Sequence, residues 1–247
     1  MTLVMNLGNT NITLGAATEK GIEQTRIPIG NFTDLSQTTA FLMPLLTARP
    51  ALTGCAISSV VPEKTALLSQ AVQTLTGINP QVITHEQIAL DCASYKGKAG
   101  IDRLVCCEAV YAEQGGPCLV FDLGTATTAN LVDSSGRFLG GAITAGVTLG
   151  LEALRSGTAQ LDLPAETVAP KLVGTDMATC MTTGAILTAA GFLTYYYRQI
   201  TAHLGQPPAT VVTGGNAPCI LPHLTSAFIH RPNLLLEGIL RHTKKLS

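Results

Sequence analysis

One short pattern occurs twice in this chain, and it constrains the fold more than any other feature of the sequence. Each copy is an apolar strand that ends in a polar residue followed by Leu and Gly, after which the chain turns and a second strand begins. The copies are Asn6-Leu7-Gly8 and Asp122-Leu123-Gly124, which lie 116 positions apart (122 − 6). A strand, a glycine turn and a strand that recur near the middle of a chain predict a duplicated architecture.

Strands and helices are expected to alternate around both copies. Apolar and β-branched runs predict strands at residues 3–5, 12–16, 54–61, 81–84, 118–121, 127–132, 138–144 and 211–213. Helices are expected at residues 34–48, 62–75, 102–114, 147–156, 183–204 and 234–245. Gly115-Gly116-Pro117 is the clearest linker signal. The sequence therefore predicts an α/β protein with two domains, residues 1–115 and 116–247.

Composition narrows the classes of partner. The formal net charge is -1, there is no Trp, and aromatic residues make up 4%, so neither nucleic acid nor an anionic membrane is an expected partner. The N-terminus lacks a basic region, and no run of about 18 apolar residues predicts a membrane span. Seven cysteines without a CxxC pair predict a reduced, cytoplasmic protein without structural zinc. Charged residues make up only 13%, which fits either a tightly packed α/β protein or one that hides surface in an oligomer.

Three glycine turns at strand ends could hold a phosphate. They are Gly8-Asn9-Thr10, the stretch from Gly124 to Thr128, and Thr213-Gly214-Gly215. Backbone N–H groups in a tight turn can surround a phosphate, and Thr hydroxyls add donors. Each turn alone is better explained as a plain hairpin or loop, but the three together favour a nucleotide site. The chain has neither GxxxxGK[ST] nor GxGxxG, which disfavours P-loop and Rossmann mechanisms.

An ordered set of motifs resembles the type III pantothenate kinases, a family within the actin, hexokinase and heat-shock ATPase superfamily. The motifs span nearly the whole chain: Gly8-Asn9-Thr10, Ser58-Ser59-Val60-Val61-Pro62, Gly100-Ile101-Asp102-Arg103, Asp122–Thr128, Gly140-Gly141-Ala142-Ile143 with Gly146, Thr158-Ala159-Gln160-Leu161, Thr213-Gly214-Gly215 and Leu236-Glu237-Gly238. The resemblance implies two duplicated ribonuclease-H-like (actin-type ATPase) domains, each a mixed sheet flanked by helices. It also implies a homodimer formed through helices of the second half.

The resemblance also implies an activity and a substrate site. The family uses ATP to phosphorylate the primary hydroxyl of pantothenate, giving 4′-phosphopantothenate in the first step of coenzyme A biosynthesis. Asp102 matches the catalytic base, and Tyr95, Gly100, Ile101 and Arg103 match residues around pantothenate. An Arg guanidinium can bind the substrate carboxylate with two parallel hydrogen bonds. Without the resemblance, a helix cap would explain Asp102 and a surface charge would explain Arg103.

The nucleotide and cations are assigned in the same way. The residues that match the ATP site are Asn6, Leu7, Gly8, Asn9, Thr10, Asn11, Thr125 and Gly214. Asp122 matches the ligand of a monovalent cation, K⁺ or NH₄⁺, and its alternative is an ordinary carboxylate at a strand end. Mg²⁺ is expected with the ATP phosphates.

The chain departs from the family pattern at three places. The first loop of the family begins with Asp, where this chain has Asn6, and hard cations prefer carboxylate ligands. After Thr128 the family tends to have Phe-Asp, where this chain has Ala129-Asn130, and a substrate-contacting Thr aligns with Met177. Three functions therefore remain open: a working pantothenate kinase whose Mg²⁺ is held mainly through ATP and water, a weakened homologue with an accessory or regulatory role, or a kinase with a shifted substrate.

Overall fold

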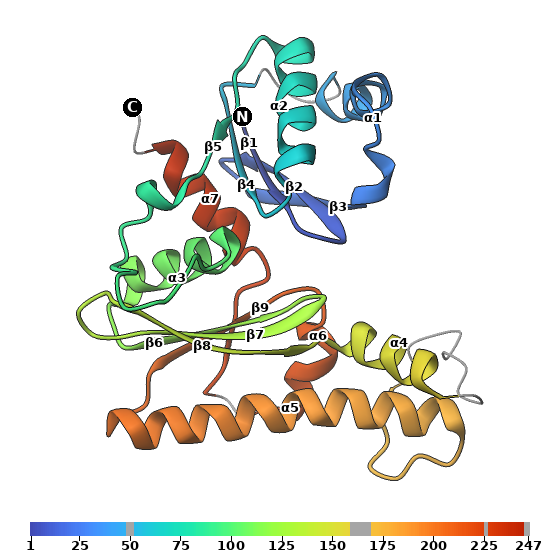
Figure 1. Ribbon diagram of the computed structural model, residues 1–247, viewed down its shortest axis with the longest axis vertical. Coiled ribbons are helices and arrows are strands. Elements are labelled where there is room, and N and C mark those ends of the chain that lie inside the picture. The colour runs from blue at the N-terminus through green and yellow to red at the C-terminus, as the bar shows by residue number, and fades with distance from the viewer. Residues whose placement is uncertain (48–51, 159–168, 225–226, 245–247) are drawn as a thin grey trace. The chain divides into compact units, whose positions relative to one another are not determined.

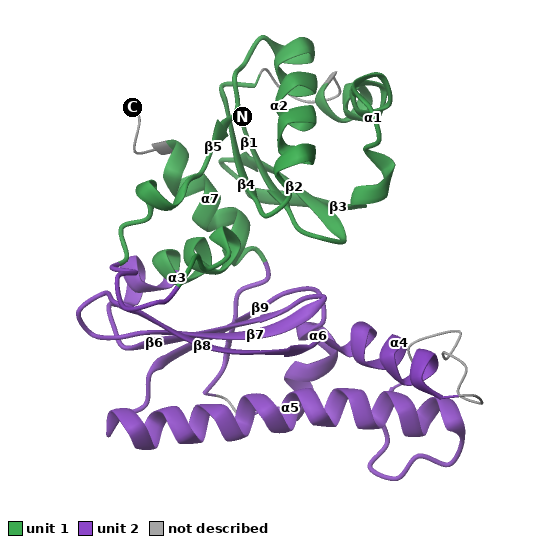
Figure 2. Ribbon diagram, in the orientation of Figure 1, with its two compact units in different colours: residues 1–90, 97–109, 233–247 green, residues 91–96, 110–232 purple. Residues whose placement is uncertain are grey.

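The computed structural model describes residues 1–47, 52–158, 169–224 and 227–244. The chain forms two compact units, coloured separately in Figure 2. Unit 1 comprises residues 1–90, 97–109 and 233–247, and unit 2 comprises residues 91–96 and 110–232. Neither unit is continuous in sequence. The division into domains at residues 115 and 116 stays a prediction.

Unit 1 is built on a five-stranded mixed sheet in the order β3-β2-β1-β4-β5 (Figure 1). Strands β1 to β3 form an antiparallel meander, whereas β4 and β5 run parallel to β1. The strands are β1 (Thr2–Leu7), β2 (Asn11–Thr18), β3 (Gly21–Pro28), β4 (Gly54–Ser59) and β5 (Gln81–Val82).

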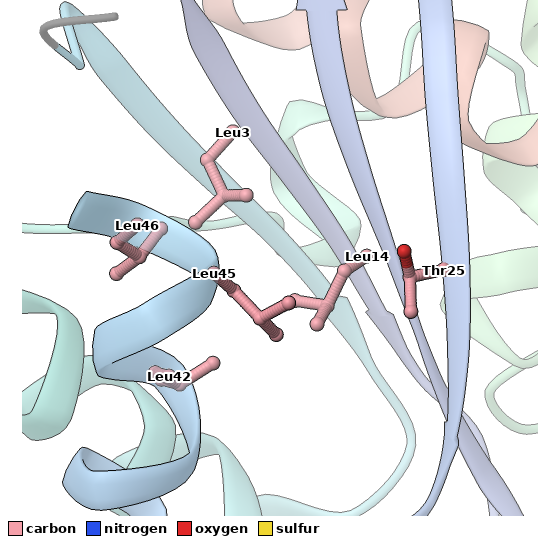
Figure 3. A pocket seen from close by; sticks show the side chains of 6 residues that line it. All are labelled: Leu3, Leu14, Thr25, Leu42, Leu45 and Leu46. Atoms are coloured by element: carbon pink, nitrogen blue, oxygen red, sulfur yellow. The ribbon is translucent and has the colours of Figure 1, made fainter. Parts of the chain in front are cut away.

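Helices α1 (Leu35–Thr47) and α2 (Pro62–Thr76) pack on one face of this sheet. Side chains alternate along β1, so Leu3, Met5 and Leu7 share that face with the buried side chains of both helices. Proline at the first turn of α2 and Gly77 in the left-handed region just after it set the limits of that helix. Figure 3 shows a small apolar hollow between α1 and the sheet, lined by Leu3, Leu14, Thr25, Leu42, Leu45 and Leu46.

The C-terminal helix α7 (Leu234–Lys244) packs against β1 and β4, and also against the first part of α3 (Ile101–Gln114). Gly238 permits the close approach to α3, because a Cβ there would lie 2.6 Å from a methyl carbon of Val105. A buried hydrogen bond also joins these two helices, between His242 Nε2 and Glu108 Oε2 at 2.8 Å. Helix α7 therefore completes the fold of unit 1, although it is far in sequence from the other elements of that unit.

Unit 2 repeats the strand order of unit 1. Its sheet has the order β10-β9-β6-β7-β8, in which β6 to β8 are antiparallel and β9 and β10 run parallel to β6. The strands are β6 (Cys118–Leu123), β7 (Ala126–Val132), β8 (Phe138–Ala145), β9 (Ala209–Thr213) and β10 (Ile229–His230). The predicted duplicated fold of two mixed sheets flanked by helices is thus confirmed.

The helices of unit 2 are α4 (Val147–Gly157), α5 (Met177–Leu204) and the short α6 (Ala217–Ile220). Phe121 of β6 contacts Phe192 and Tyr196 of α5 with ring centroids 6.4 and 6.3 Å apart, which joins the helix to the sheet. By length and composition α5 could cross a membrane, but 44% of its apolar stretch is buried inside the molecule, and one such helix is weak evidence for a membrane span.

Several elements differ from the prediction. The helix α5 begins six residues before Thr183 (183 − 177), because Asp176 caps it by accepting a hydrogen bond from Thr179 N at 2.8 Å. Strands β3 and β10 and helix α6 were not predicted, and β5 is shorter than expected. The described residues also form three short 3₁₀ helices, at Ile29–Asn31, His85–Gln87 and Leu221–His223. The predicted end of the first helix, at residue 48, lies outside the described residues.

Candidate functional site

The first loop, residues 6–11, follows the carboxyl end of β1 in unit 1. Gly8 N donates to Asn11 O at 3.0 Å, which closes the turn, and Ile29 N donates to Thr10 O at 2.9 Å, which ties it to the start of a 3₁₀ helix. A Cβ on Gly8 would lie 3.3 Å from Asn11 O, tighter than most contacts of real Cβ atoms. The backbone of the loop is therefore fixed before any ligand binds.

Asn6 lies at the base of this loop and is buried, with 9% of its surface exposed. Its Oδ1 atom has no hydrogen-bond partner. The residue in register on the parallel strand β4 is Ser58, which is fully buried and whose Oγ atom also lacks a partner. Buried polar atoms are nearly always hydrogen-bonded, so two such atoms on adjacent strands need an explanation. The sequence analysis placed Ser58 in a motif but missed it as a site residue.

The second loop, residues 122–128, lies at the carboxyl end of β6 in unit 2. Gly146 N donates to Thr125 O at 2.9 Å, and Asn216 donates from Nδ2 to Gly124 O at 2.9 Å. A Cβ on Gly146 would overlap the carbonyl oxygen of Gly124, so only glycine fits there. Two segments distant in sequence, at Gly146 and at Asn216, therefore hold this loop. Asn216 was not expected from the sequence.

The third turn, residues 213–215, contacts the second loop directly. Gly214 has φ +97°, in the region that favours glycine, and a Cβ on it would lie 2.5 Å from both Asp122 Oδ1 and Leu123 N. Thr213 is in register with Asp122 on the neighbouring strand. Within unit 2 the structure thus brings Asp122, Leu123 and Gly214 together.

Asp102 lies in the first turn of α3, in unit 1. Its Oδ1 accepts a hydrogen bond from Arg103 N at 2.8 Å, and a Cβ on Gly100 would lie 2.6 Å from the same oxygen. Burial raises the pKa of the Asp102 carboxyl, and the hydrogen bond and charge of Arg103 oppose that rise. The carboxylate therefore acts as a helix-terminal acceptor and is also a stronger proton acceptor than an exposed Asp.

The residues predicted around the substrate are divided between the units. Gly100, Ile101, Asp102 and Arg103 are consecutive in unit 1, whereas Tyr95 belongs to unit 2. The Tyr95 ring packs edge-on against Phe138 with centroids 5.3 Å apart. Gly140, with φ +88°, leaves room for it, because a Cβ there would lie 3.0 Å from Tyr95 Cε2. The contacts of residues 100–103 are therefore given within unit 1, and those of Tyr95 within unit 2.

The other two departures from the family pattern, Asn130 and Met177, lie in unit 2. Asn130 is buried and donates from Nδ2 to Val120 O at 3.3 Å and to Thr128 Oγ1 at 3.0 Å. Met177 is the first residue of α5 and is 54% exposed. Of the motif at residues 158–161, only Thr158 lies within the described residues.

The described residues contain no group of three or more His, Cys, Asp or Glu side chains arranged to hold a metal ion. In the first loop, the polar side chains are amides and a hydroxyl, without a carboxylate. This donor set does not fit a divalent cation held by protein ligands. Asp122, by contrast, supplies a carboxylate beside the backbone of Leu123 and Gly214, which fits a weakly bound monovalent cation.

Solved structures with the same architecture include a Baf family transcriptional activator from Campylobacter jejuni. It superposes with a TM-score of 0.61 at 16% identity, covering 99% of this chain and 98% of that one. An inorganic polyphosphate/ATP-glucomannokinase from Arthrobacter sp. strain KM superposes with a TM-score of 0.50 at 16% identity, covering 100% and 99%. At these identities the likeness shows the fold alone.

Curated relatives of this chain are named type III pantothenate kinase. The protein of Thermomicrobium roseum is 29% identical over 252 residues, covering 97% of this chain and 95% of the relative. That of Phenylobacterium zucineum is 32% identical over 252 residues, covering 97% and 96%. The family model described as type III pantothenate kinase matches residues 2–199. With the duplicated fold and glycine turns in place, the chain belongs to the type III pantothenate kinase family.

Proposed function

We propose that this protein transfers the γ-phosphoryl group of ATP to the primary hydroxyl of pantothenate, giving 4′-phosphopantothenate in the first step of coenzyme A biosynthesis. Membership of the family supports a kinase that uses ATP. The observation that carries the catalytic assignment is the Asp102 carboxylate, whose pKa is raised by burial at the start of α3.

Asp102 is the general base in this proposal. A base is most effective when its pKa lies near the working pH, and a raised carboxyl pKa moves in that direction. The substrate hydroxyl gives its proton to Asp102 as its oxygen attacks the γ-phosphorus and the bond to the β-phosphate oxygen breaks. Arg103 binds the pantothenate carboxylate, and Gly100, Ile101 and Tyr95 line the substrate.

The family motifs assign residues 6–11 of unit 1, and Thr125 and Gly214 of unit 2, to nucleotide binding. In unit 1 the backbone of residues 6–11 cradles phosphate. The fixed backbone of both loops supports this assignment, because phosphate binding by N–H groups requires a preformed turn. The proposed roles of these residues follow their match to the family motif.

Two cations accompany the reaction in this proposal. A monovalent cation, K⁺ or NH₄⁺, is held at Asp122, and Mg²⁺ enters with the ATP phosphates, because the first loop supplies no carboxylate. When bound, both cations reduce the negative charge around the transferred phosphoryl group. Asp122 and the backbone of Gly214 hold the monovalent ion.

We also propose that the protein is a cytoplasmic homodimer. The described part of unit 2 exposes large apolar side chains on α4 and α5 and just before α5: Leu149, Leu154, Leu172, Val173, Met177 and Tyr195. Exposed apolar surface of this kind marks interaction sites. The partner assigned to it, a second copy of the chain, follows the family resemblance.

A second candidate function is favoured by Asn6. Its amide lacks the charge of a carboxylate, which supports a homologue that binds nucleotide or pantothenate but transfers phosphate poorly. The exposed Met177 supports a kinase with a different acceptor.

One assay separates these candidates. Wild-type protein is mixed with ATP, Mg²⁺, K⁺ and pantothenate, and ADP release and 4′-phosphopantothenate are both measured. The proposed function predicts turnover on the order of 1–100 s⁻¹, as for other kinases. No turnover at millimolar ATP, with ATP binding intact, would favour the weakened homologue. ADP release that occurs with another pantothenate-like alcohol, and not with pantothenate, would favour a kinase with a shifted substrate.

A further inference from the structure

The duplication gives Asn6 a counterpart in the other half of the chain. Asn6 of β1 is in register with Ser58 of the parallel strand β4, and Asp122 of β6 is in register with Thr213 of the parallel strand β9. The strand orders make β1 correspond to β6 and β4 to β9. Asn6 and Ser58 therefore stand in unit 1 where Asp122 and Thr213 stand in unit 2. One pair includes a carboxylate, and the other is neutral.

The neutral pair has unmet hydrogen-bonding capacity. Asn6 Oδ1 and Ser58 Oγ are both buried and neither has a partner. Residues in register on neighbouring parallel strands lie about 4.8 Å apart, with side chains on the same face of the sheet. The pair is also at the carboxyl ends of parallel strands, where open α/β sheets bind ligands. A ligand that reorients these two side chains would allow both atoms to form hydrogen bonds.

The amide of Asn6 has two different ends. Its Oδ1 atom is buried. Its Nδ2 atom lies near the turn, 3.9 Å from the position that a Cβ on Gly8 would take. An amide nitrogen can only donate hydrogen bonds. The polar side chains of residues 6–11 are likewise uncharged, so this loop offers donors for an anion.

We propose that Asn6 donates a hydrogen bond from Nδ2 to a nucleotide phosphate, and that Ser58 is a positioning residue whose hydroxyl donates to Asn6 Oδ1 and fixes that orientation. The inference rests on the proposed use of ATP. A hydroxyl donor rotates freely, so a small rotation of the Asn6 side chain on phosphate binding joins the two atoms. The first loop then binds phosphate through neutral donors and needs no metal ion of its own.

Calorimetric titration of the full-length protein with ATP tests this. Each protein is titrated once with EDTA and once with excess Mg²⁺. The variants are Asn6→Ala, Asn6→Asp, Ser58→Ala and the double variant Asn6→Ala/Ser58→Ala. Thr38→Val is the matched control, because Thr38 is also a fully buried unit 1 residue with an unpartnered hydroxyl, but it lies on α1. Thermal unfolding confirms that each variant folds, and Ser58→Cys replaces Ser58→Ala if the latter does not.

The proposal predicts a specific pattern of affinities. In EDTA, Asn6→Ala weakens ATP binding about 10-fold or more, because a hydrogen bond to a charged acceptor is lost. Asn6→Asp weakens it further, since a carboxylate then faces the phosphates, and Mg²⁺ restores much of the loss. The ratio of the dissociation constants in EDTA and in Mg²⁺ therefore rises about 10-fold or more over wild type. Ser58→Ala alone weakens ATP binding several-fold. In the Asn6→Ala background it causes no further loss of affinity.

Three outcomes would overturn the proposal. Asn6→Asp could bind ATP in EDTA as tightly as wild type, which would exclude Nδ2 as a phosphate donor. Ser58→Ala could weaken ATP binding by the same factor with and without Asn6→Ala, which would show that Ser58 does not act through Asn6. Thr38→Val could show the same loss, which would indicate general destabilisation. In each of these cases the wild-type protein still binds ATP, so the proposed function stands. If the wild-type protein binds no ATP, both the proposed function and the role of Asn6 are wrong.

Discussion

The Asp122 carboxylate occupies the space that a side chain at residue 214 would need. A Cβ on Gly214 would lie 2.5 Å from Asp122 Oδ1, and the φ of +97° at Gly214 is unfavourable for any other residue. The two residues come from β6 and from the turn after β9, and they are 92 positions apart in sequence (214 − 122). Asp122 can therefore take this position only because residue 214 has no side chain.

Gly214→Ala should damage both stability and nucleotide binding. The backbone strain alone costs about 1–2 kcal/mol, and the new methyl group displaces Asp122. We expect a lower unfolding temperature and ATP affinity reduced about 10-fold or more in the presence of K⁺. The matched control is Gly205→Ala, at φ +71° after α5 with nothing within 4 Å of the new Cβ. That variant should lose stability but keep its ATP affinity; equal loss of affinity in both would contradict the role of Asp122.

Asp102→Asn should remove nearly all phosphoryl transfer and leave ATP binding intact. Removal of a general base lowers turnover by about 10²–10⁴-fold. Because the folded pKa of Asp102 lies above its unfolded value, the folded state binds more protons, so ionisation of Asp102 costs stability as pH rises through this range. The variant should therefore unfold at the same or a higher temperature at pH 7, and wild-type activity should fall as acid protonates Asp102. A variant that retains turnover excludes this base.

Much of the fold was predictable because its signals are local. The glycine turn after β1 and proline at the start of α2 act within a few residues, and both elements lie where the sequence placed them. Strand β3 was missed because it is largely polar and exposed, without an apolar alternation. The start of α5 was missed because its cap, Asp176, and its partner Thr179 precede the apolar run that marks the helix.

The site was less predictable, because its contacts join distant segments. Asp102 and Asp122 were predicted from their match to the family motifs, and their environments depend on neighbours that the motifs do not name. Ser58 was missed because its relation to Asn6 is one of register between strands 52 residues apart (58 − 6). Asn216, which holds the second loop through Gly124, carries no local signal. The equivalence of β4 and β9 in the duplicated sheets was the one signal that could have pointed to Ser58.

The buried Glu108 should contribute more to stability than an exposed carboxylate. Glu108 accepts from Ala89 N at 3.2 Å and pairs with His242, which anchors α7 to α3. We expect Glu108→Ala to lower the free energy of unfolding by about 3–5 kcal/mol, measured by urea denaturation. Glu113→Ala, which removes a partly exposed pair with Arg231, should cost about 1 kcal/mol or less. Equal costs would show that α7 does not depend on the buried pair.

Restoring the carboxylate that the family tends to have at residue 130 should destabilise this protein. Asn130 is 1% exposed and donates to Val120 O, an acceptor that cannot pair with an ionised carboxylate. Asn130→Asp therefore leaves two oxygens facing each other in a buried position, at a cost of about 2–4 kcal/mol at pH 7. Protonation of the new carboxyl restores a donor, so its pKa rises on folding and the cost shrinks as pH falls. Urea denaturation at pH 5 and pH 7 checks both statements. A variant as stable as wild type at pH 7 would show that the Asn130 amide is not needed at this position.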